Sequence, residues 1–161
     1  MSKSKKKYFN HIIDSTLTGI GALIALSVIG LVAEEVGYMM IIAPFGATAV
    51  LLFSVPDSRF SKPINVFAGY FIATFVGFIV LHYSSGNWLS VGVGLGATIM
   101  FMHLFNVIHP PAGANYFIVI QGQFTMYSVE PIFIGLVTLV TIGIVVEKIR
   151  KSLADKCNYC P

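Results

Sequence analysis

Charged residues are scarce in this chain. They make up 11% of its 161 residues, whereas an ordinary soluble domain carries about 25%. No Asp, Glu, Lys or Arg occurs between Lys62 and Glu130, and 56% of the residues are hydrophobic. The mean hydropathy is +0.82. Because charges are missing from long continuous runs, the composition excludes an ordinary soluble domain and indicates one compact domain in a lipid bilayer.

Cysteine and the residue groups of catalysis are also rare. Only Cys157 and Cys160 occur, so a disulfide framework is excluded. Their Cys-x-x-Cys spacing supplies two of the four ligands that zinc requires, and we interpret the segment as a plain tail. No Walker pattern, Ser-His-Asp order or carboxylate pair lies in an apolar run. We therefore expect no enzyme, cofactor or metal site. The net charge of +3 forms no broad basic surface, so we expect no nucleic-acid partner.

Six hydrophobic segments account for most of the chain. They are residues 15–33, 36–55, 64–81, 89–105, 108–120 and 131–146. The first has 19 residues, which as an α-helix are about 28 Å long and sufficient to cross a bilayer core. We predict an all-α membrane protein with a basic N-terminus (1–14), a transmembrane domain (15–147) and a charged tail (148–161).

The second and fifth segments share a proline-led pattern. Residues 44–48 read Pro-Phe-Gly-Ala-Thr and residues 111–115 read Pro-Ala-Gly-Ala-Asn, so both fit Pro-x-Gly-Ala-polar. The segments that follow also match at an offset of 66, which pairs Phe67 with Phe133, Gly69 with Gly135, and Gly77 with Gly143. We predict two repeats, 15–82 and 89–147, each with a span, a broken span and a span. An odd number of spans makes the repeats inverted, as in many transporters.

The distribution of charge predicts the topology. If all six segments cross and the N-terminus is cytoplasmic, all ten basic residues lie inside, and Glu34, Glu35 and Glu130 lie outside, in agreement with the positive-inside rule. If the two broken segments are re-entrant, four spans remain and Arg59 and Lys62 face outward. We prefer six spans with both termini cytoplasmic. The lack of a long targeting extension favours a bacterial inner membrane.

The two proline-led turns are the candidate binding site. Proline disfavours a helix before it but is well placed in a first helical turn. The amides that follow would then lie free near the bilayer midplane, where the positive end of a helix suits a small anion. The alternative is that both turns are only packing kinks. The candidate substrate-binding residues are Pro44, Phe45, Gly46, Ala47, Thr48, His109, Pro110, Pro111, Gly113, Ala114 and Asn115.

Three of these candidates carry polar side chains. Thr48 and Asn115 would add side-chain donors to the amides. His109 is either a proton carrier or anion ligand, since imidazole titrates near neutral pH and ionisable groups in membranes are often functional, or a neutral ring bonded to a carbonyl that the prolines set free. The sequence leaves these roles of His109 open.

A family resemblance is carried by the same residues. The run His-Pro-Pro-Ala-Gly-Ala at 109–114 resembles the signature of the HPP family of integral membrane proteins, and residues 43–53, 63–66 and Gly69 are also similar to that family. The resemblance covers about residues 15–147. Members are bacterial, fungal and plant membrane proteins, usually described as having four spans, and some are linked to nitrite transport. The resemblance implies a membrane protein whose ligand is nitrite.

The expected function is a membrane transporter or channel for a small inorganic anion. No Arg or Lys lies in a predicted span, so backbone dipoles, hydroxyls and amides must bind it, which favours a small, weakly hydrated anion. The alternative is a non-transporting scaffold or an enzyme subunit. Gly92 and Gly96 have the spacing that lets helix backbones approach, either inside the chain or in a homo-oligomer.

Overall fold

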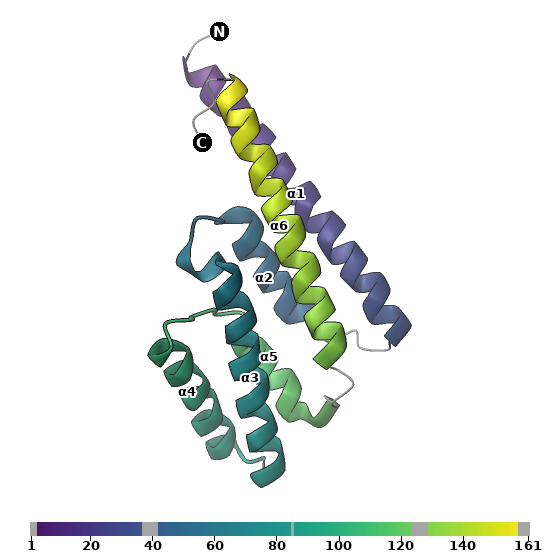
Figure 1. The fold of residues 1–161 in the computed structure, drawn as a ribbon, viewed down its shortest axis with the longest axis vertical. Coiled ribbons are helices and arrows are strands. Elements are labelled where there is room, and N and C mark those ends of the chain that lie inside the picture. Colours follow the sequence, from purple (N-terminus) through teal and green to yellow (C-terminus); the bar gives the residue numbers. More distant parts are fainter. Residues whose placement is uncertain (1–2, 37–41, 85, 124–128, 158–161) are drawn as a thin grey trace.

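The computed structural model describes residues 3–36, 42–84, 86–123 and 129–157, and all of its regular structure is helical (Figure 1). The helices are α1 (Lys3–Val36), α2 (Ile42–Ser54), η2 (Arg59–Ser61), α3 (Pro63–Tyr83), α4 (Trp88–Leu104), α5 (Ala112–Ile118), η3 (Val119–Gln123) and α6 (Val129–Cys157). Each predicted hydrophobic segment overlaps one of these α-helices, although the bounds differ most at α1, α5 and α6. The all-α fold class is therefore confirmed for the described residues.

The helices differ widely in length. Among the described residues, three stretches are long and apolar enough to cross a bilayer: His11–Glu35 in α1, Pro63–Tyr83 in α3 and Val129–Leu153 in α6. With 13 and 17 residues, α2 and α4 are shorter, about 20 and 26 Å, and α5 has seven, about 10 Å. Helix length therefore does not support six full helical crossings.

Some predictions fall outside the described residues, and the predicted ends of the transmembrane domain differ from the ends of its helices. Residues 37–41 of the second segment lie outside the described part of the chain, and so does Cys160. The basic N-terminus and the charged tail continue the first and last apolar helices, because α1 begins at Lys3 and α6 ends at Cys157.

Local sequence explains where several helices begin and end. Pro63 occupies the first position of α3, where its missing N–H removes no helical hydrogen bond. The side chain of Asn87 caps α4 by accepting from the amide of Ser90. After α4, Asn106 adopts a φ of 56°, a conformation that Asn tolerates better than most residues. Gly122, at φ 72°, turns the chain at the end of η3.

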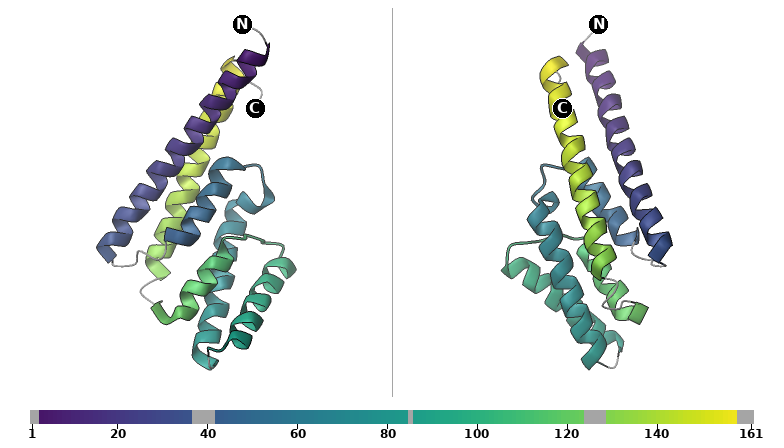
Figure 2. Two further views of the ribbon diagram at one scale, coloured as in Figure 1. Left: turned by 180° about the vertical axis from the view of Figure 1, so that it is seen from behind. Right: turned by 45° about the vertical axis from the view of Figure 1, so that its right-hand side comes forward.

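Successive α-helices run in alternating directions, and both termini lie at the same end of the molecule (Figures 1 and 2). α3 packs against α4 and α5, whereas α6 packs against α1 and α2. The third helix of each half therefore lies on the first two helices of the other half. The two short helices α2 and α5 begin near the middle of the molecule, contact each other and run in opposite directions.

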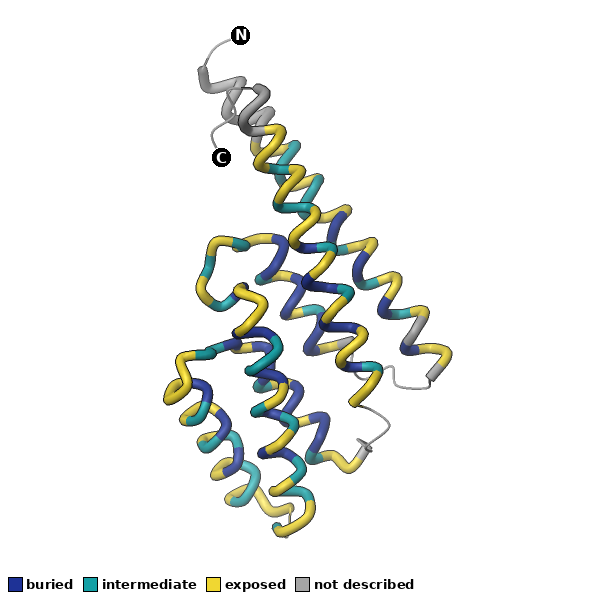
Figure 3. The backbone as a smooth tube through the Cα atoms, in the orientation of Figure 1, coloured by how far each residue is buried: buried dark blue, intermediate teal, exposed yellow. Residues whose placement is uncertain are grey.

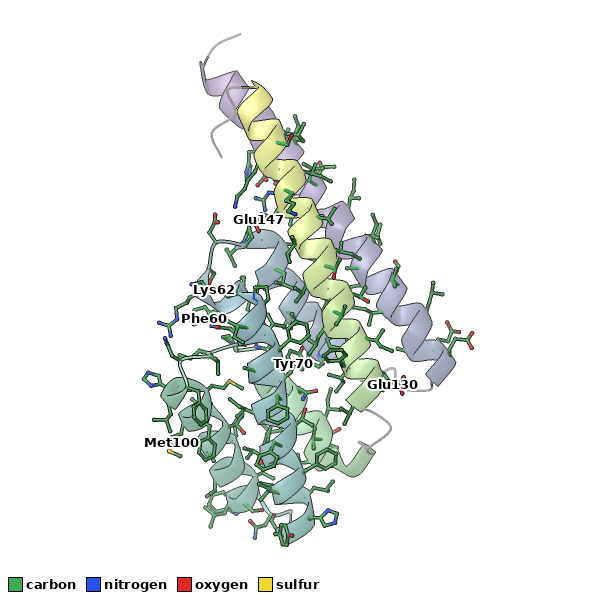
Figure 4. The ribbon with its side chains drawn as sticks, in the orientation of Figure 1. Phe60, Lys62, Tyr70, Met100, Glu130 and Glu147 are labelled. Atoms are coloured by element: carbon green, nitrogen blue, oxygen red, sulfur yellow. The ribbon has the colours of Figure 1, made fainter. Side chains whose placement is uncertain are left out.

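Arg150 joins three helices near the end that holds the termini. Its guanidinium donates to both carboxylate oxygens of Asp14 on α1 and to the carbonyl oxygen of Phe53 on α2. Lys62 lies closer to this end than Glu130, at the start of α6, does (Figure 4). The polar ends of α1 and α6 are thus fixed to the bundle.

Buried residues line the faces that the helices turn towards one another, and exposed residues alternate with them on the outside (Figure 3). Large apolar side chains stand on that outer surface, and several are more than half exposed: Leu23, Leu31, Phe71, Phe75 and Ile99. An apolar outer surface of this extent suits contact with lipid acyl chains.

Candidate functional site

The two proline-led turns lie next to each other at the starts of α2 and α5. Pro44 is the third residue of α2, and Pro111 directly precedes α5. Both prolines therefore occupy the first turn of a helix, where their lack of an N–H costs least. The two turns lie far apart in the chain, with Thr48 and His109 separated by 61 positions, so only the tertiary structure brings them into contact.

The amides after both prolines are already hydrogen-bonded. The N–H groups of Ala112, Gly113 and Ala114 donate at 3.0 Å to the carbonyl oxygens three residues earlier. α2 begins at Ile42, and only the first four amides of a helix lack a partner within it. The amides of residues 46–48 come after those four, so carbonyl oxygens of the helix accept from them. The prediction of free amides at these turns is therefore wrong. The carbonyl oxygens of the His-Pro-Pro segment and of the first turn of α2 accept hydrogen bonds from these amides.

Side chains, rather than amides, form the polar contact between the turns. The Nε2 atom of His109 lies 3.0 Å from Thr48 Oγ1, which lies 2.9 Å from the Oη of Tyr70 and 3.0 Å from the carbonyl oxygen of Pro44. His109 Nδ1 lies 2.8 Å from the carbonyl oxygen of Phe60. Figure 4 labels Tyr70 in the middle of the bundle and Phe60 nearer its edge. We call this connected set the His109–Thr48–Tyr70 chain.

The hydrogen positions in this chain follow from its acceptors. A carbonyl oxygen only accepts, so Nδ1 of His109 carries the hydrogen that it donates to Phe60. In a neutral imidazole Nε2 is then an acceptor, and the hydroxyl of Thr48 is the donor beside it. His109, Thr48 and Tyr70 are at most 2% exposed. Each therefore depends on the others for its hydrogen bonds.

Close packing fixes the position of His109. A Cβ atom at Gly69 of α3 would lie 2.8 Å from the Cβ of His109, so only glycine allows this approach. The imidazole and the ring of Tyr70 have centroids 5.7 Å apart. On the other half of the fold, a Cβ at Gly135 of α6 would lie 2.4 Å from the ring of Phe45. Each turn is thus pressed against a glycine of a long helix.

Asn115 is a second buried polar group beside this chain. It is fully buried, and its Nδ2 donates to Thr74 Oγ1 at 2.8 Å, but its Oδ1 has no hydrogen-bond partner within the described structure. Thr74 lies one helical turn beyond Tyr70 on α3. Which end of the amide is oxygen is an assignment, and the Thr74 hydroxyl can bond either end. One end of a buried amide is therefore left for another group.

The predicted site residues divide into two sets. Those enclosed by the fold are Pro44, Phe45, Thr48, His109, Pro111 and Asn115. Those on more open surface are Gly46, Ala47, Pro110, Gly113 and Ala114. A Cβ at Gly46 would meet no atom within 4 Å, and at Gly113 only Leu95, at 3.9 Å. The glycines of the turns thus border open space, while the polar side chains face inward.

Sequence reasoning missed several residues that position the site. The predicted residues did not include Tyr70 and Thr74, although a hydroxyl in an uncharged span is a signal for a buried hydrogen bond. The predicted set of site residues also left out Asn65, whose Nδ2 donates to the carbonyl oxygens of Arg59 (2.9 Å) and Ile108 (3.2 Å). These bonds join the loop before α3 to the segment that precedes α5.

A small pocket lies beside the first turn of α2. It has a volume of about 10 Å³, room for about one water. Side chains of α1, α2 and α6 line it: Ile29, Ala33, Phe45, Pro131, Ile134, Gly135 and Thr138. The pocket therefore reaches Phe45 but does not hold a ligand larger than water.

Comparison with known proteins places this architecture in a family. The profile of the HPP transmembrane region matches residues 8–154. The chain belongs to the HPP transmembrane family. The resemblance seen at residues 109–114 is thereby confirmed, and it extends over nearly the whole chain.

Two curated relatives of this HPP chain are transmembrane proteins of Dictyostelium discoideum. One is 32% identical over 94 residues, which cover 56% of this chain and 33% of the relative. The other is 24% identical over 142 residues, which cover 83% of this chain and 46% of the relative. The chain thus spans between a third and a half of the length of these relatives. No solved structure matches it.

Proposed function

We propose that this HPP protein is a transporter or channel for a small inorganic anion. The observation that carries the proposal is the meeting of α2 and α5, where the polar side chains of Thr48, His109 and Asn115 are buried inside a membrane bundle. Polar groups inside a membrane domain are costly and commonly mark a substrate path. Nitrite is the first candidate, because some members of the family that the sequence resembles are linked to its transport.

We propose that the chain consists of two inverted repeats, an arrangement that many transporters share. In this proposal α1 corresponds to α4, α2 to α5, and α3 to α6, which is supported by the contacts of α3 with α4 and α5 and of α6 with α1 and α2. The glycines that the offset of 66 pairs in the sequence make similar contacts, since each lies close to a residue in or directly after a short helix. A Cβ at Gly77 would lie 2.8 Å from Val119, which follows α5, and one at Gly143 would lie 3.5 Å from Leu52 of α2. Two inverted halves around a central site can rock to give alternating access.

The chemistry of the buried groups favours a small monovalent anion. No Lys or Arg occurs between Lys62 and Lys148, so the site offers no permanent positive charge to offset the dehydration of phosphate or a dicarboxylate. The unpartnered end of the Asn115 amide becomes an NH2 donor when the side chain rotates by half a turn.

The orientation that we propose places both termini in the cytoplasm. Lys62 lies nearer than Glu130 to the end of the molecule at which α6 finishes, Arg150 lies in the last part of α6, and by the positive-inside rule we place that end in the cytoplasm. The membrane that we propose is a bacterial inner membrane. Thiol labelling from each side, at single cysteines introduced at Ser58 and Glu130, tests this orientation.

Anion uptake into liposomes tests the proposed function. Leucine at Gly46 or Gly113 has room to fit, because almost no atom lies near either position, and it covers the open surface beside the turns. We expect Gly46→Leu and Gly113→Leu to lose most of the uptake. Gly96→Leu on α4, which also borders open space, is the matched control and should keep it. Uptake unchanged in both turn variants would remove this site from the transport path.

A non-transporting scaffold is the competing function. It is favoured by the paired amides of Gly113 and Ala114 and by the small volume of the pocket beside Phe45. Thermal unfolding of the purified protein against nitrite, nitrate and chloride separates the two functions. A transporter is stabilised by an anion that it binds, by an amount set by concentration over Kd, whereas a scaffold shows the same melting temperature in all three salts.

A further inference from the structure

The hydroxyl of Thr48 faces more partners than it can donate to. Its Oγ1 lies within 3.0 Å of the Pro44 carbonyl oxygen, Tyr70 Oη and His109 Nε2, but it carries one hydrogen. With His109 neutral, Thr48 donates to Nε2, Tyr70 donates to Thr48, and the Pro44 contact receives no hydrogen. The approach of Thr48 Oγ1 to the Pro44 carbonyl oxygen, which the helix already pairs with an amide, is then a short contact between two oxygens with no hydrogen between them.

A proton on His109 satisfies every contact in the cluster. Nδ1–H still donates to Phe60, and Nε2–H now donates to Thr48 Oγ1. Tyr70 donates to the second lone pair of the same oxygen, and the Thr48 hydroxyl turns to donate to Pro44. The two states differ by one proton and by one rotation of a hydroxyl, and no heavy atom needs to move. The geometry is therefore compatible with both protonation states of the ring.

Within the described residues no carboxylate beside His109 balances such a proton, because Asp57, in the loop that leads to Phe60, is exposed to the outside, as is Lys62. From α3 the titratable group that faces it is Tyr70, and α2 and α5 contain no charged residue. The neighbouring loop carries Arg59, whose guanidinium donates to Asn106 Oδ1. The one titratable side chain of α5, Tyr116, donates away from the cluster to the carbonyl oxygen of Val91. A lone imidazolium here is costly, so it requires an anion close by.

We infer that His109 takes up a proton at Nε2 together with the transported anion, so that transport is proton-coupled with one proton for each monovalent anion. This inference rests on the proposed function. The proton comes from the side of the membrane from which the anion enters, forms the Nε2–H bond, and leaves as a proton with the anion on the other side. Thr48 is the positioning residue, because its hydroxyl supplies the hydrogen bond that each state of His109 needs. The anion supplies the missing negative charge, and by linkage each ligand strengthens the binding of the other.

The wild-type protein in liposomes tests the coupling directly. Symport of one proton with one monovalent anion moves no net charge. A pH gradient, acid on the entry side, should therefore drive uptake of nitrate and nitrite with the potential held at zero, to about tenfold accumulation per pH unit. A membrane potential without a pH gradient should drive none. Protein-free liposomes give the background, because nitrous acid crosses lipid unaided and nitrate does not.

Variants identify the proton site. In His109→Gln, uptake should no longer follow the pH gradient, while Thr98→Val, in which a buried threonine away from the cluster changes, should behave as the wild type. If wild-type uptake follows the potential and ignores the pH gradient, the coupling is wrong and anion transport stands. If no anion enters under either gradient, both proposals fail. Should His109→Gln not fold, the wild-type result alone decides.

Discussion

Replacing Thr48 by valine separates the His109–Thr48–Tyr70 chain from ordinary helix packing. Valine keeps the shape of threonine and removes its hydroxyl. Thr48 and Thr98 are both fully buried, and both hydroxyls reach the carbonyl oxygen four residues earlier. Thr48 alone also bonds His109 and Tyr70. The difference between Thr48→Val and Thr98→Val therefore measures the interhelical bonds.

The expected magnitude follows from the two bonds that are lost. A side-chain hydrogen bond between membrane helices contributes about 0.6 kcal/mol on average and up to about 1.7 kcal/mol. Two such bonds give about 1–3 kcal/mol, the same range as leaving one buried polar group unpartnered. In a protein of this size each kcal/mol shifts the melting temperature by about 2–4 °C. We therefore expect Thr48→Val to melt about 2–12 °C below Thr98→Val.

Thermal unfolding in detergent, followed by circular dichroism, measures this difference. A double variant sharpens it: Tyr70→Phe removes the hydroxyl that Thr48→Val leaves without a partner, so the two substitutions together should cost less than the sum of their separate effects. Equal melting temperatures for Thr48→Val and Thr98→Val, with additive effects in the double variant, would show that the chain contributes nothing to the fold and would refute the reasoning.

Two further predictions concern packing and the link between helices. Gly94→Ala should destabilise the protein by about 1–3 kcal/mol, because its Cβ would lie 2.3 Å from Tyr116 Oη. Gly96→Ala, with no atom within 4 Å, should be neutral or stabilising by up to about 1 kcal/mol. A melting temperature that Gly96→Ala lowers as much as Gly94→Ala, or that Gly94→Ala leaves unchanged, would contradict this. Arg150→Gln should cost about 1–3 kcal/mol by removing charged hydrogen bonds to Asp14, and a double variant with Asp14→Asn should cost less than the sum of the single changes. Additive losses in that cycle would mean that the pair does not act together.

The glycines divide in a way that the sequence did not indicate. Gly92 and Gly96 have the spacing typical of helix contacts, but both are exposed, and a Cβ at either would meet no atom of the described residues within 4 Å, so they do not pack against another described helix. Gly94, between them, is the glycine that Tyr116 approaches. Spacing along one helix shows which residues share a face, but which face meets a neighbour depends on how that neighbour packs.

The sequence by itself determined the class of the protein and the places of its helices. Long uncharged runs are stable only as membrane helices, because backbone groups in hydrocarbon must be paired within the segment. Prolines at 44 and 111 likewise indicated where α2 and α5 begin. These inferences succeed because hydropathy and proline geometry act locally along the chain.

The tertiary structure alone decided what the two turns do. The sequence predicted that their amides lie free, but carbonyls three residues earlier accept those of Ala112, Gly113 and Ala114. It also gave no indication that Thr48, Tyr70 and the carbonyl of Phe60 meet at His109. Such contacts join residues up to 61 positions apart, and they depend on how α2, α3 and α5 pack, which no local pattern of residues specifies.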